Sequence, residues 1–453
     1  MRKSIAVATI LMILSFSALA QDSEDSGSGF QFQAGINLGT DVLPDPDGLG
    51  GFSSWTRLGF QPDLSFGKIG IGLDITLRFK LSPAPGEDAV YGGDWIPDYE
   101  NNGKTFLDVY LPKFMYIRYG QRGDPLYVKL GSIQDLTLGD GFIVGDYANT
   151  RFLPEQRLFG LALDIDGALF QFPWVGAQLM TGNLARFDVV GARIFARPLY
   201  GTGIPIMESM QVGLTVAADF DPYLWYDLQN STTTPTDPIA MYGLDVFIPI
   251  LGGKAFPLAA FSDFVLQPEG RWGSMIGAGG RLFRFITYGA QLRVLGPGFI
   301  PVYFDANYDL YRADKYDLMS VAPTGDTFTG WFASLGFSVL EDKIAFKTSL
   351  DGPFAAEPAV ATTNPADYPH LRAVATLGEG LVGGFSFDAI YEKYFLGKTG
   401  TFFEDLVTAE DAVITAQINY RTGAAVLSLL YNLKYDGAGG YTVTSSLQSS
   451  IKF

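Results

Sequence analysis

The chain has 453 residues and no cysteine, so disulfide scaffolds and Cys-ligated metal centres are excluded. Its formal net charge of −17 argues against a nucleic-acid-binding protein, which needs a basic surface. With 47% hydrophobic and 17% charged residues, the chain is too apolar for a disordered protein and poor in charge for a soluble one. The 36 Phe and 23 Tyr are typical of β-structure.

The first twenty residues predict a Sec signal peptide. Arg2 and Lys3 precede an apolar run from Ile5 to Phe16, and Ala18-Leu19-Ala20 has the small-x-small pattern of a cleavage site. The run is shorter than the roughly 20 residues of a membrane-spanning helix. Cleavage after Ala20 changes the formal net charge from −17 to −19. No later segment is long and apolar enough to predict a transmembrane helix.

Residues 30–39 and 68–81 alternate between apolar and polar side chains. In the second segment the odd-numbered positions from Ile69 to Leu81 are all apolar, whereas Lys68, Asp74 and Arg78 lie on the other face. Because successive strand residues face opposite sides, each segment predicts a strand with one apolar and one polar face. Similar alternation predicts strands at 210–220, 302–310, 344–350 and 412–420.

The length of these segments predicts a membrane barrel. Many reach the 9 to 11 residues or so that a tilted strand needs to cross a bilayer. Their polar faces suit a water-filled lumen, and aromatic residues near segment ends, such as Trp55, Tyr119, Trp272 and Tyr420, fit interfacial girdles. We therefore predict an all-β transmembrane antiparallel up-and-down β-barrel of about 18–20 strands. The expected divisions are a signal peptide at 1–20, a short polar segment at 21–28 and the barrel at 29–453.

Predicted connections alternate between short and long. Short turns are expected at Gly67, 340–342 and 421–423. Long polar loops are expected at 40–54, 82–104, 134–157, 221–238, 311–327, 351–370 and 396–410. This asymmetry is that of outer-membrane barrels, with short periplasmic turns and long outer loops. Twenty-one candidate strands can be drawn, so at least one must be false if the strand count is even.

The C-terminal residues form the sharpest pattern. Phe453, Ile451, Leu447 and Tyr441 lie on one face of a predicted strand that ends the chain on an aromatic residue. This resembles the terminal strand of bacterial outer-membrane proteins, in which a final Phe and alternating apolar positions are read by the barrel-assembly machinery. The resemblance covers 29–453 as architecture and identifies no specific family. It implies a location in the outer membrane, with the lipid and the assembly machinery as partners.

Catalytic chemistry is not expected. Any Ser-His or Asp-His mechanism would have to use the single histidine, His370, whose surroundings indicate a loop entering a strand, and acid–base catalysis would also need a positioned partner. Metal sites built on His or Cys are excluded by count. No cofactor is expected. Acidic loops around Asp45-Pro46-Asp47-Gly48 and from Glu87 to Glu100 have oxygen ligands suited to Ca²⁺, but neither is followed by a full EF-hand pattern, so solvated acidic loops are the favoured interpretation.

The segment 134–157 is the main candidate for a functional loop, because loops of this length are usually functional or disordered. Apolar Phe142, Ile143 and Val144 argue against disorder, and the charges are of both signs. Either the loop folds inward and narrows the lumen, or it is a surface loop covering its own apolar cluster. The residues expected to line the pore or its constriction are Asp135, Asp140, Asp146, Arg151, Glu155, Arg157, Lys68, Asp74, Arg78 and Arg293.

The predicted function is passive diffusion of small hydrophilic solutes through an outer-membrane, porin-like channel. The alternatives are a surface adhesin or antigen displayed on a plugged barrel, and a substrate-specific uptake channel. A soluble secreted β protein such as a propeller is disfavoured, because no repeat of 40 to 50 residues is visible.

Overall fold

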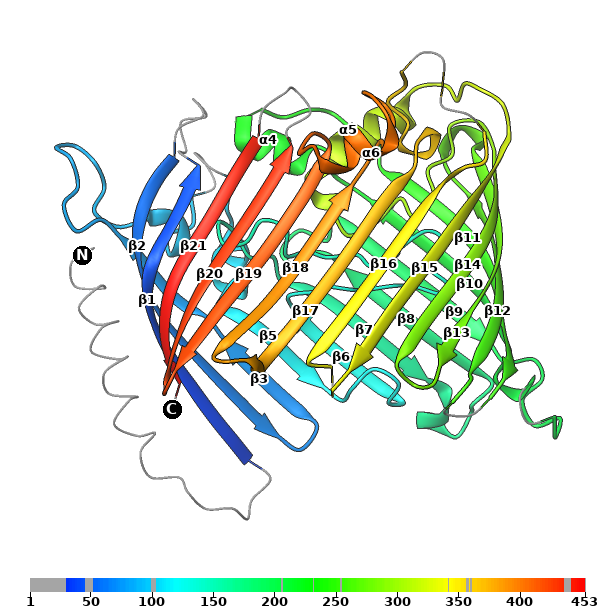
Figure 1. Ribbon diagram of the computed structural model, residues 1–453, viewed down its shortest axis with the longest axis horizontal. Coiled ribbons are helices and arrows are strands. Elements are labelled where there is room, and N and C mark those ends of the chain that lie inside the picture. Colours follow the sequence, from blue (N-terminus) through cyan, green and yellow to red (C-terminus); the bar gives the residue numbers. More distant parts are fainter. Residues whose placement is uncertain are drawn as a thin grey trace.

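The computed structural model describes residues 30–44, 52–98, 103–204, 207–230, 232–252, 255–340, 342–355, 358, 361–435 and 441–452. Within these ranges the strands form one antiparallel sheet that closes on itself as a barrel (Figure 1). The strands are β1 (Phe30–Pro44), β2 (Phe52–Phe66), β3 (Ile69–Leu73), β4 (Ile75–Phe79), β5 (Phe114–Tyr119), β6 (Leu126–Gly131), β7 (Gly160–Asp166), β8 (Val175–Thr181), β9 (Val189–Ala196), β10 (Gln211–Asp219), β11 (Ile239–Leu251), β12 (Leu258–Leu266), β13 (Trp272–Leu282), β14 (Ile286–Leu295), β15 (Phe328–Val339), β16 (Ile344–Pro353), β17 (His370–Val382), β18 (Phe385–Lys393), β19 (Ala412–Thr422), β20 (Ala425–Tyr435) and β21 (Tyr441–Lys452). The helices are α3 (Phe106–Tyr110), α4 (Leu224–Asn230), α5 (Tyr308–Ser320) and α6 (Phe402–Val407), with 3₁₀ turns η2 (Gly92–Asp94), η3 (Leu111–Lys113), η4 (Gly167–Phe170), η5 (Met207–Ser209), η6 (Pro268–Gly270) and η7 (Pro365–Asp367).

The barrel wall has twenty strands in the described residues, because β3 and β4 are two halves of one strand. Both halves pair with β2, and the interruption is at Asp74, whose backbone N–H donates to the carbonyl of Lys113 at 2.7 Å. The first strand pairs with β2 on one side and with β21 on the other, which closes the sheet. The predicted fold class and strand number are therefore confirmed.

Closure brings β1 and β21 into close backbone contact at Gly39. A Cβ atom at this position would lie 2.1 Å from the carbonyl oxygen of Leu447, whereas a Cβ at Gly35, on the same strand and face, would meet nothing closer than 3.9 Å. We expect Gly39→Ala to destabilise the barrel by about 1–3 kcal/mol, the typical cost of overpacking. Gly35→Ala is the matched control and should unfold like the wild type. The denaturant midpoint of the refolded barrel in detergent measures both, and equal midpoints would contradict the expectation.

Apolar residues face outward and charged residues face inward, the reverse of a soluble protein. On the outside Leu214, Ile276 and Leu292 are 57%, 62% and 60% exposed, whereas on the inside Asp41 and Arg57 are 0% and 5% exposed. Because hydrocarbon offers no hydrogen bonds, a closed barrel with this polarity is the architecture of a transmembrane β-barrel. None of the helices within the described ranges is long and apolar enough to span a bilayer.

Aromatic residues lie at the rims, with one exception among those predicted. Tyr119 is the last residue of β5, and Tyr420 lies two residues before the end of β19, where it packs on Phe385 with ring centroids 4.6 Å apart. Trp272 begins β13 at the opposite end and stacks on Phe264. The prediction for Trp55 is wrong: this residue is buried against Tyr91, because the connection after β4 covers it.

Connections at the two ends of the barrel differ as predicted. The predicted turns at Gly67 and 421–423, and the described residues Leu340 and Asp342 of the third predicted turn, lie at one end, here called the turn end, while α4, α5 and α6 lie at the loop end (Figure 1). The loop predicted at 40–54 is shorter, because β1 continues to Pro44 and β2 begins at Phe52. The strand predicted at 302–310 is wrong, because α5 begins at Tyr308 and the residues before it form turns.

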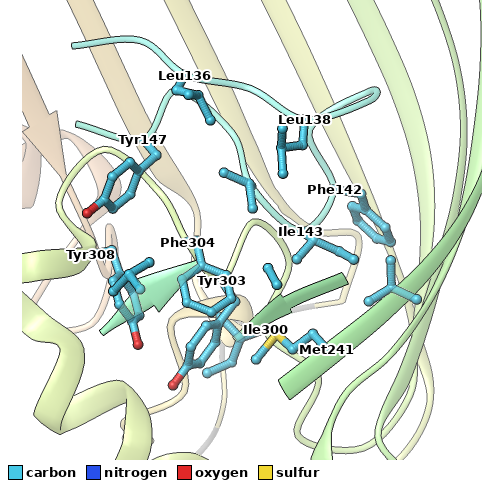
Figure 2. Packing of buried hydrophobic residues seen from close by; sticks show 14 of the residues in the cluster. Leu136, Leu138, Phe142, Ile143, Tyr147, Met241, Ile300, Tyr303, Phe304 and Tyr308 are labelled. Carbon is cyan, nitrogen blue, oxygen red and sulfur yellow. The ribbon is translucent and has the colours of Figure 1, made fainter. Parts of the chain in front are cut away.

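Two long connections enter the barrel and pack against each other. The first, Ser132–Phe159, is called the inward loop, and the second, Gly296–Thr327, which contains α5, is called the second inward segment. Val144 and Phe304 form a parallel bridge between them. Their apolar side chains join inward-facing wall residues in one buried cluster (Figure 2). The cluster includes Leu136, Leu138, Phe142, Ile143 and Tyr147 of the inward loop, Ile300, Tyr303, Phe304 and Tyr308 of the second segment, and Met241 of β11.

Candidate functional site in the barrel lumen

The lumen has a packed half and a polar half. On β7 to β13 the inward positions include Ala162, Met180, Ala217, Met241 and Val265, which pack beneath the two inward connections. On β15 to β21 the inner face is instead polar, and most of its positions are half-buried or exposed, although Thr444 is buried. Its residues include Ser334, Lys347, Ser349, Thr376, Asp388, Gln417, Asn419, Asn432, Thr444 and Gln448. Any aqueous path must therefore follow the polar half.

A cavity of about 1030 Å³ lies between the inward connections and the wall from β14 to β18. Its lining mixes charges of both signs with a few aromatic rings, and its volume is that of a site for a small molecule. The charged residues that line it are Asp140, Asp146, Arg293, Asp305, Asp314, Lys315, Asp317, Lys347, Asp351, His370, Arg372, Glu392, Lys398 and Asp411.

Opposite the cavity, an ion network joins the inward loop to the first strands. Asp74 accepts from Arg57 at 3.3 Å and from Arg157 of the inward loop at 2.8 Å. Arg78 donates to Asp41 and to Asp94, both at 2.8 Å, and also to the carbonyl of Pro154. Three of the predicted pore residues, Asp74, Arg78 and Arg157, are thus brought together, but they are fully engaged in holding the loop to the wall.

Glu155 and Arg151 flank this network in the same loop. Glu155 lies among Arg78 and Lys104, and burial raises the pKa of its carboxyl group despite these two cations. Arg151 donates to the carbonyl of Ala306 at 2.9 Å and thereby ties the inward loop to the second segment. Burial lowers the pKa of Arg151.

The tip of the inward loop reaches the polar half through Asp146. Its carboxylate lies 3.5 Å from Lys347 and 3.6 Å from Arg372, which project from β16 and β17. Lys347 and Asp146 keep 58% and 39% of their side-chain surfaces exposed, so they border the open space. Here the loop and the opposite wall therefore carry charges of opposite sign in direct contact.

Arg293 belongs to a row of paired charged side chains on the cavity wall, here called the charge relay. It donates to Asp351 at 2.7 Å, and His370 lies between Asp351 and Glu392 with each ring nitrogen 3.1 Å from a carboxylate oxygen. The imidazole also stacks on Tyr394 with centroids 4.5 Å apart. Both ring nitrogens of His370 are therefore engaged with carboxylates of the barrel wall.

Asp140 lies on the packed side, beside Asp245 and Asp263 of β11 and β12. Burial, and to a smaller extent the negative charge of Asp245, raises the pKa of Asp140 to about 7. Asp135 is exposed, and its carbonyl accepts from Arg122 at 3.3 Å. Lys68 lies apart from all of these residues, in the turn after β2, where it pairs with Asp124 at 3.1 Å.

Of the predicted assembly residues, Ile451 and Leu447 lie on the outer face of β21, 52% and 47% exposed. Tyr441 begins this strand opposite Tyr435, and Phe453 is outside the described residues.

The predicted acidic loops are described only in part, because residues 45–48 and Glu100 are outside the described residues. In the other predicted acidic loop, Glu87 binds Lys80 at 3.1 Å and Asp94 binds Arg78, so both carboxylates already have cationic partners.

Several charged lumen residues were not singled out from the sequence. Each stands at an inward position of an alternating strand, and that position is the signal that could have found it. These residues are Asp41, Arg57, Arg193, Asp245, Asp263, Arg372 and Glu392.

No protein-family model and no curated protein sequence matches the chain. Among solved structures, the chain is similar to a BenF-like porin from Pseudomonas fluorescens Pf-5, with 9% identity over 94% of this chain and 98% of that one and a TM-score of 0.34. Pseudomonas aeruginosa OpdK, solved with vanillate, gives 10% identity over 93% and 98%, with a TM-score of 0.34. The outer-membrane protein OprD of Pseudomonas aeruginosa gives 7% identity over 95% of both chains, with a TM-score of 0.32. Likeness at this level assigns neither a family nor a substrate.

Proposed function

We propose that this protein is a bacterial outer-membrane channel that passes small hydrophilic solutes by diffusion. The observation that carries the proposal is the unequal lumen: one half is packed by the inward connections, and the other presents polar side chains beside a cavity of about 1030 Å³. An apolar exterior and a polar, partly open interior are what a channel in a bilayer requires.

The inward loop would act as the constriction in this channel. Asp146 on the loop pairs with Lys347 and Arg372 on the wall, so a solute that passes beside this contact meets acidic and basic groups together. Rings of charged side chains select solutes by sign and by their ability to exchange hydrogen bonds. The lumen therefore favours polar solutes over apolar ones, without a covalent step.

Export and assembly complete the proposal. Residues 1–20 would direct Sec export, and the C-terminal strand would be read by the barrel-assembly machinery before insertion into outer-membrane lipid. The turn end would face the periplasm and the loop end the exterior, as in other barrels of this class.

Planar-bilayer recording of the refolded mature protein tests the proposal. A heated-versus-unheated gel shift first establishes that the barrel is closed. We expect discrete conductance steps in symmetrical salt. A closed barrel that gives no steps would contradict the channel function and favour a surface adhesin, with the inward connections acting as a plug.

A substrate-specific uptake channel is the second candidate, and the charge relay Arg293–Asp351–His370–Glu392 favours it. These residues hold donors and acceptors at fixed positions on the cavity wall, which suits recognition of one solute class. Specific uptake would show as a saturable reduction of ion conductance by its solute. A general channel would show none.

A further inference from the structure

Three carboxylates from different parts of the chain converge on the packed side of the lumen. Asp140 comes from the inward loop, Asp245 from β11 and Asp263 from β12, and one oxygen of each lies within 4.8 Å of the others. Asp245 and Asp263 are directly opposite each other in the strand register. Like charges in that position are unfavourable unless something compensates them.

The protein's own cations compensate only part of this charge. Arg193 donates to both oxygens of Asp245, through Nε at 2.9 Å and through a terminal nitrogen at 2.5 Å. Asp263 is 6% exposed, and its Oδ1 has no hydrogen-bond partner within the described residues. Oδ2 of Asp140 is likewise buried without a partner there. Buried carboxylate oxygens left in this state are costly, so both point to a missing electropositive partner.

Space for such a partner exists between the three groups. A cavity of about 10 Å³ is bordered by the three carboxylates together with Thr215, Phe142 and Val265. A volume of this size holds about one water molecule or one ion. Three ionised carboxylates and Arg193 leave a formal charge of −2, which one divalent cation neutralises. The donors are all oxygens, the ligands that Ca²⁺ and Mg²⁺ prefer.

We propose that Asp140, Asp245 and Asp263 bind one divalent cation, with Ca²⁺ the best match, which fastens the inward loop to the barrel wall. Thr215 on β10 adds a neutral hydroxyl oxygen at the edge of the same cavity. The site differs from the acidic outer loops, because two of its ligands are inward-facing strand residues. It does not depend on whether the lumen conducts.

The bound cation would determine how firmly the residues of the constriction are held in place. Asp140 and Asp146 belong to the same ten-residue excursion between Leu136 and Tyr147, whose backbones pair at 2.8 and 3.0 Å. Fastening Asp140 to the wall therefore restrains the position of Asp146 opposite Lys347 and Arg372. Without the cation, repulsion among the carboxylates would loosen this excursion.

Isothermal titration of Ca²⁺ into the refolded, chelator-treated barrel in detergent tests the proposal. We expect one saturable site with a dissociation constant of about 10⁻⁴–10⁻³ M, the range of extracellular calcium modules. Asp263→Asn keeps the side-chain shape and should weaken binding at least about tenfold. Asp388→Asn is the matched control, since it removes an exposed lumen carboxylate on β18 that pairs with Thr376, and its affinity should be unchanged.

A second measurement covers the case in which Asp263→Asn affects folding. The denaturant midpoint of the wild type should rise with added Ca²⁺, because a ligand that binds only the folded state stabilises it. Asp140→Asn, in the loop, should abolish that rise while the heated-versus-unheated gel shift persists. No saturable binding up to about 10 mM Ca²⁺ or Mg²⁺ would overturn the proposal and indicate that the carboxylates share a proton. Unchanged affinity in Asp263→Asn would overturn it equally, by placing binding elsewhere.

Discussion

Replacing Thr137–Asp146 with Asn-Gly is expected to raise the single-channel conductance roughly twofold or more, because the replaced residues form the part of the inward loop that crosses the lumen. The design follows from the backbone. Leu136 and Tyr147 pair as neighbours on antiparallel segments, so their ends are already close enough for a two-residue turn. Asn-Gly is the favoured sequence for such a turn. The change removes Asp146 from its place opposite Lys347 and Arg372.

The control must separate a wider lumen from a shorter chain. Deleting Gly201–Gly203, which are exposed residues in the connection between β9 and β10 at the turn end, shortens the chain outside the lumen. This deletion should leave the conductance unchanged. Both variants are compared only if they keep the gel shift of a closed barrel. Equal conductance of the Asn-Gly variant and the wild type would show that the narrowest point lies elsewhere.

Replacing Arg312 with Met is expected to destabilise the protein by about 3–5 kcal/mol, the usual cost of removing one partner from a buried ion pair. Arg312 on α5 donates to Asp219 at 2.5 and 3.0 Å and to Asp188 at 2.6 Å. Asp309 lies 3.9 Å away. Without the guanidinium group, carboxylates that are at most 3% exposed would lose their cation. The denaturant midpoint measures the loss.

Arg281→Met is the matched control for this variant, since Arg281 is an exposed residue of β13, and it should unfold near the wild-type midpoint. Restoring charge balance by adding Asp219→Asn to Arg312→Met should recover part of the stability. A wild-type midpoint for Arg312→Met would contradict the prediction and mean that α5 is held by apolar packing alone.

The pH dependence of Arg312→Met follows from the same cluster. Burial raises the pKa of Asp309 to about 7 in the intact protein, although Arg312 opposes the shift. A carboxyl group whose pKa is higher in the folded state destabilises the fold progressively as pH rises from the unfolded value near 4 to the folded value. Removing Arg312 takes away the opposing effect, so the stability deficit of the variant should be smaller at pH 5 than at pH 8.

The barrel could be predicted from the sequence because its strands obey a simple rule. A residue such as Leu214 must face lipid and its neighbour Thr215 must face inward, so alternation persists along each strand. The same rule failed at 302–310, where polar and apolar residues also alternate. There Tyr303 and Phe304 are both buried, since inside the barrel a segment meets protein on every side and period-2 patterning no longer reports a single apolar face.

The candidate site could be predicted in part. The composition of 134–157 marked it as unusual, and the inward position of Asp74 and Arg78 followed from strand periodicity. The partners could not be predicted, because Asp140 meets Asp245 and Asp263 only through folding of the loop across the lumen. Alternation alone also placed one residue wrongly: Lys68 continues the alternating pattern of the strand, but it lies in the turn at Gly67 and not in the barrel wall. Contacts between residues far apart in the chain, such as those of Asp140 with Asp245 and Asp263, leave no signal in the local sequence.

The division of the lumen into a packed half and a polar half separates two kinds of constraint on this protein. Substitutions on the inner faces of β7 to β13 disturb a close-packed interior and are felt as lost stability. Substitutions at exposed inner positions such as Asp388 on β18 and Gln417 on β19 alter side chains that are mainly in contact with water. The polar half can therefore change its solute preference over evolutionary time, or under directed selection, while the packed half preserves the fold.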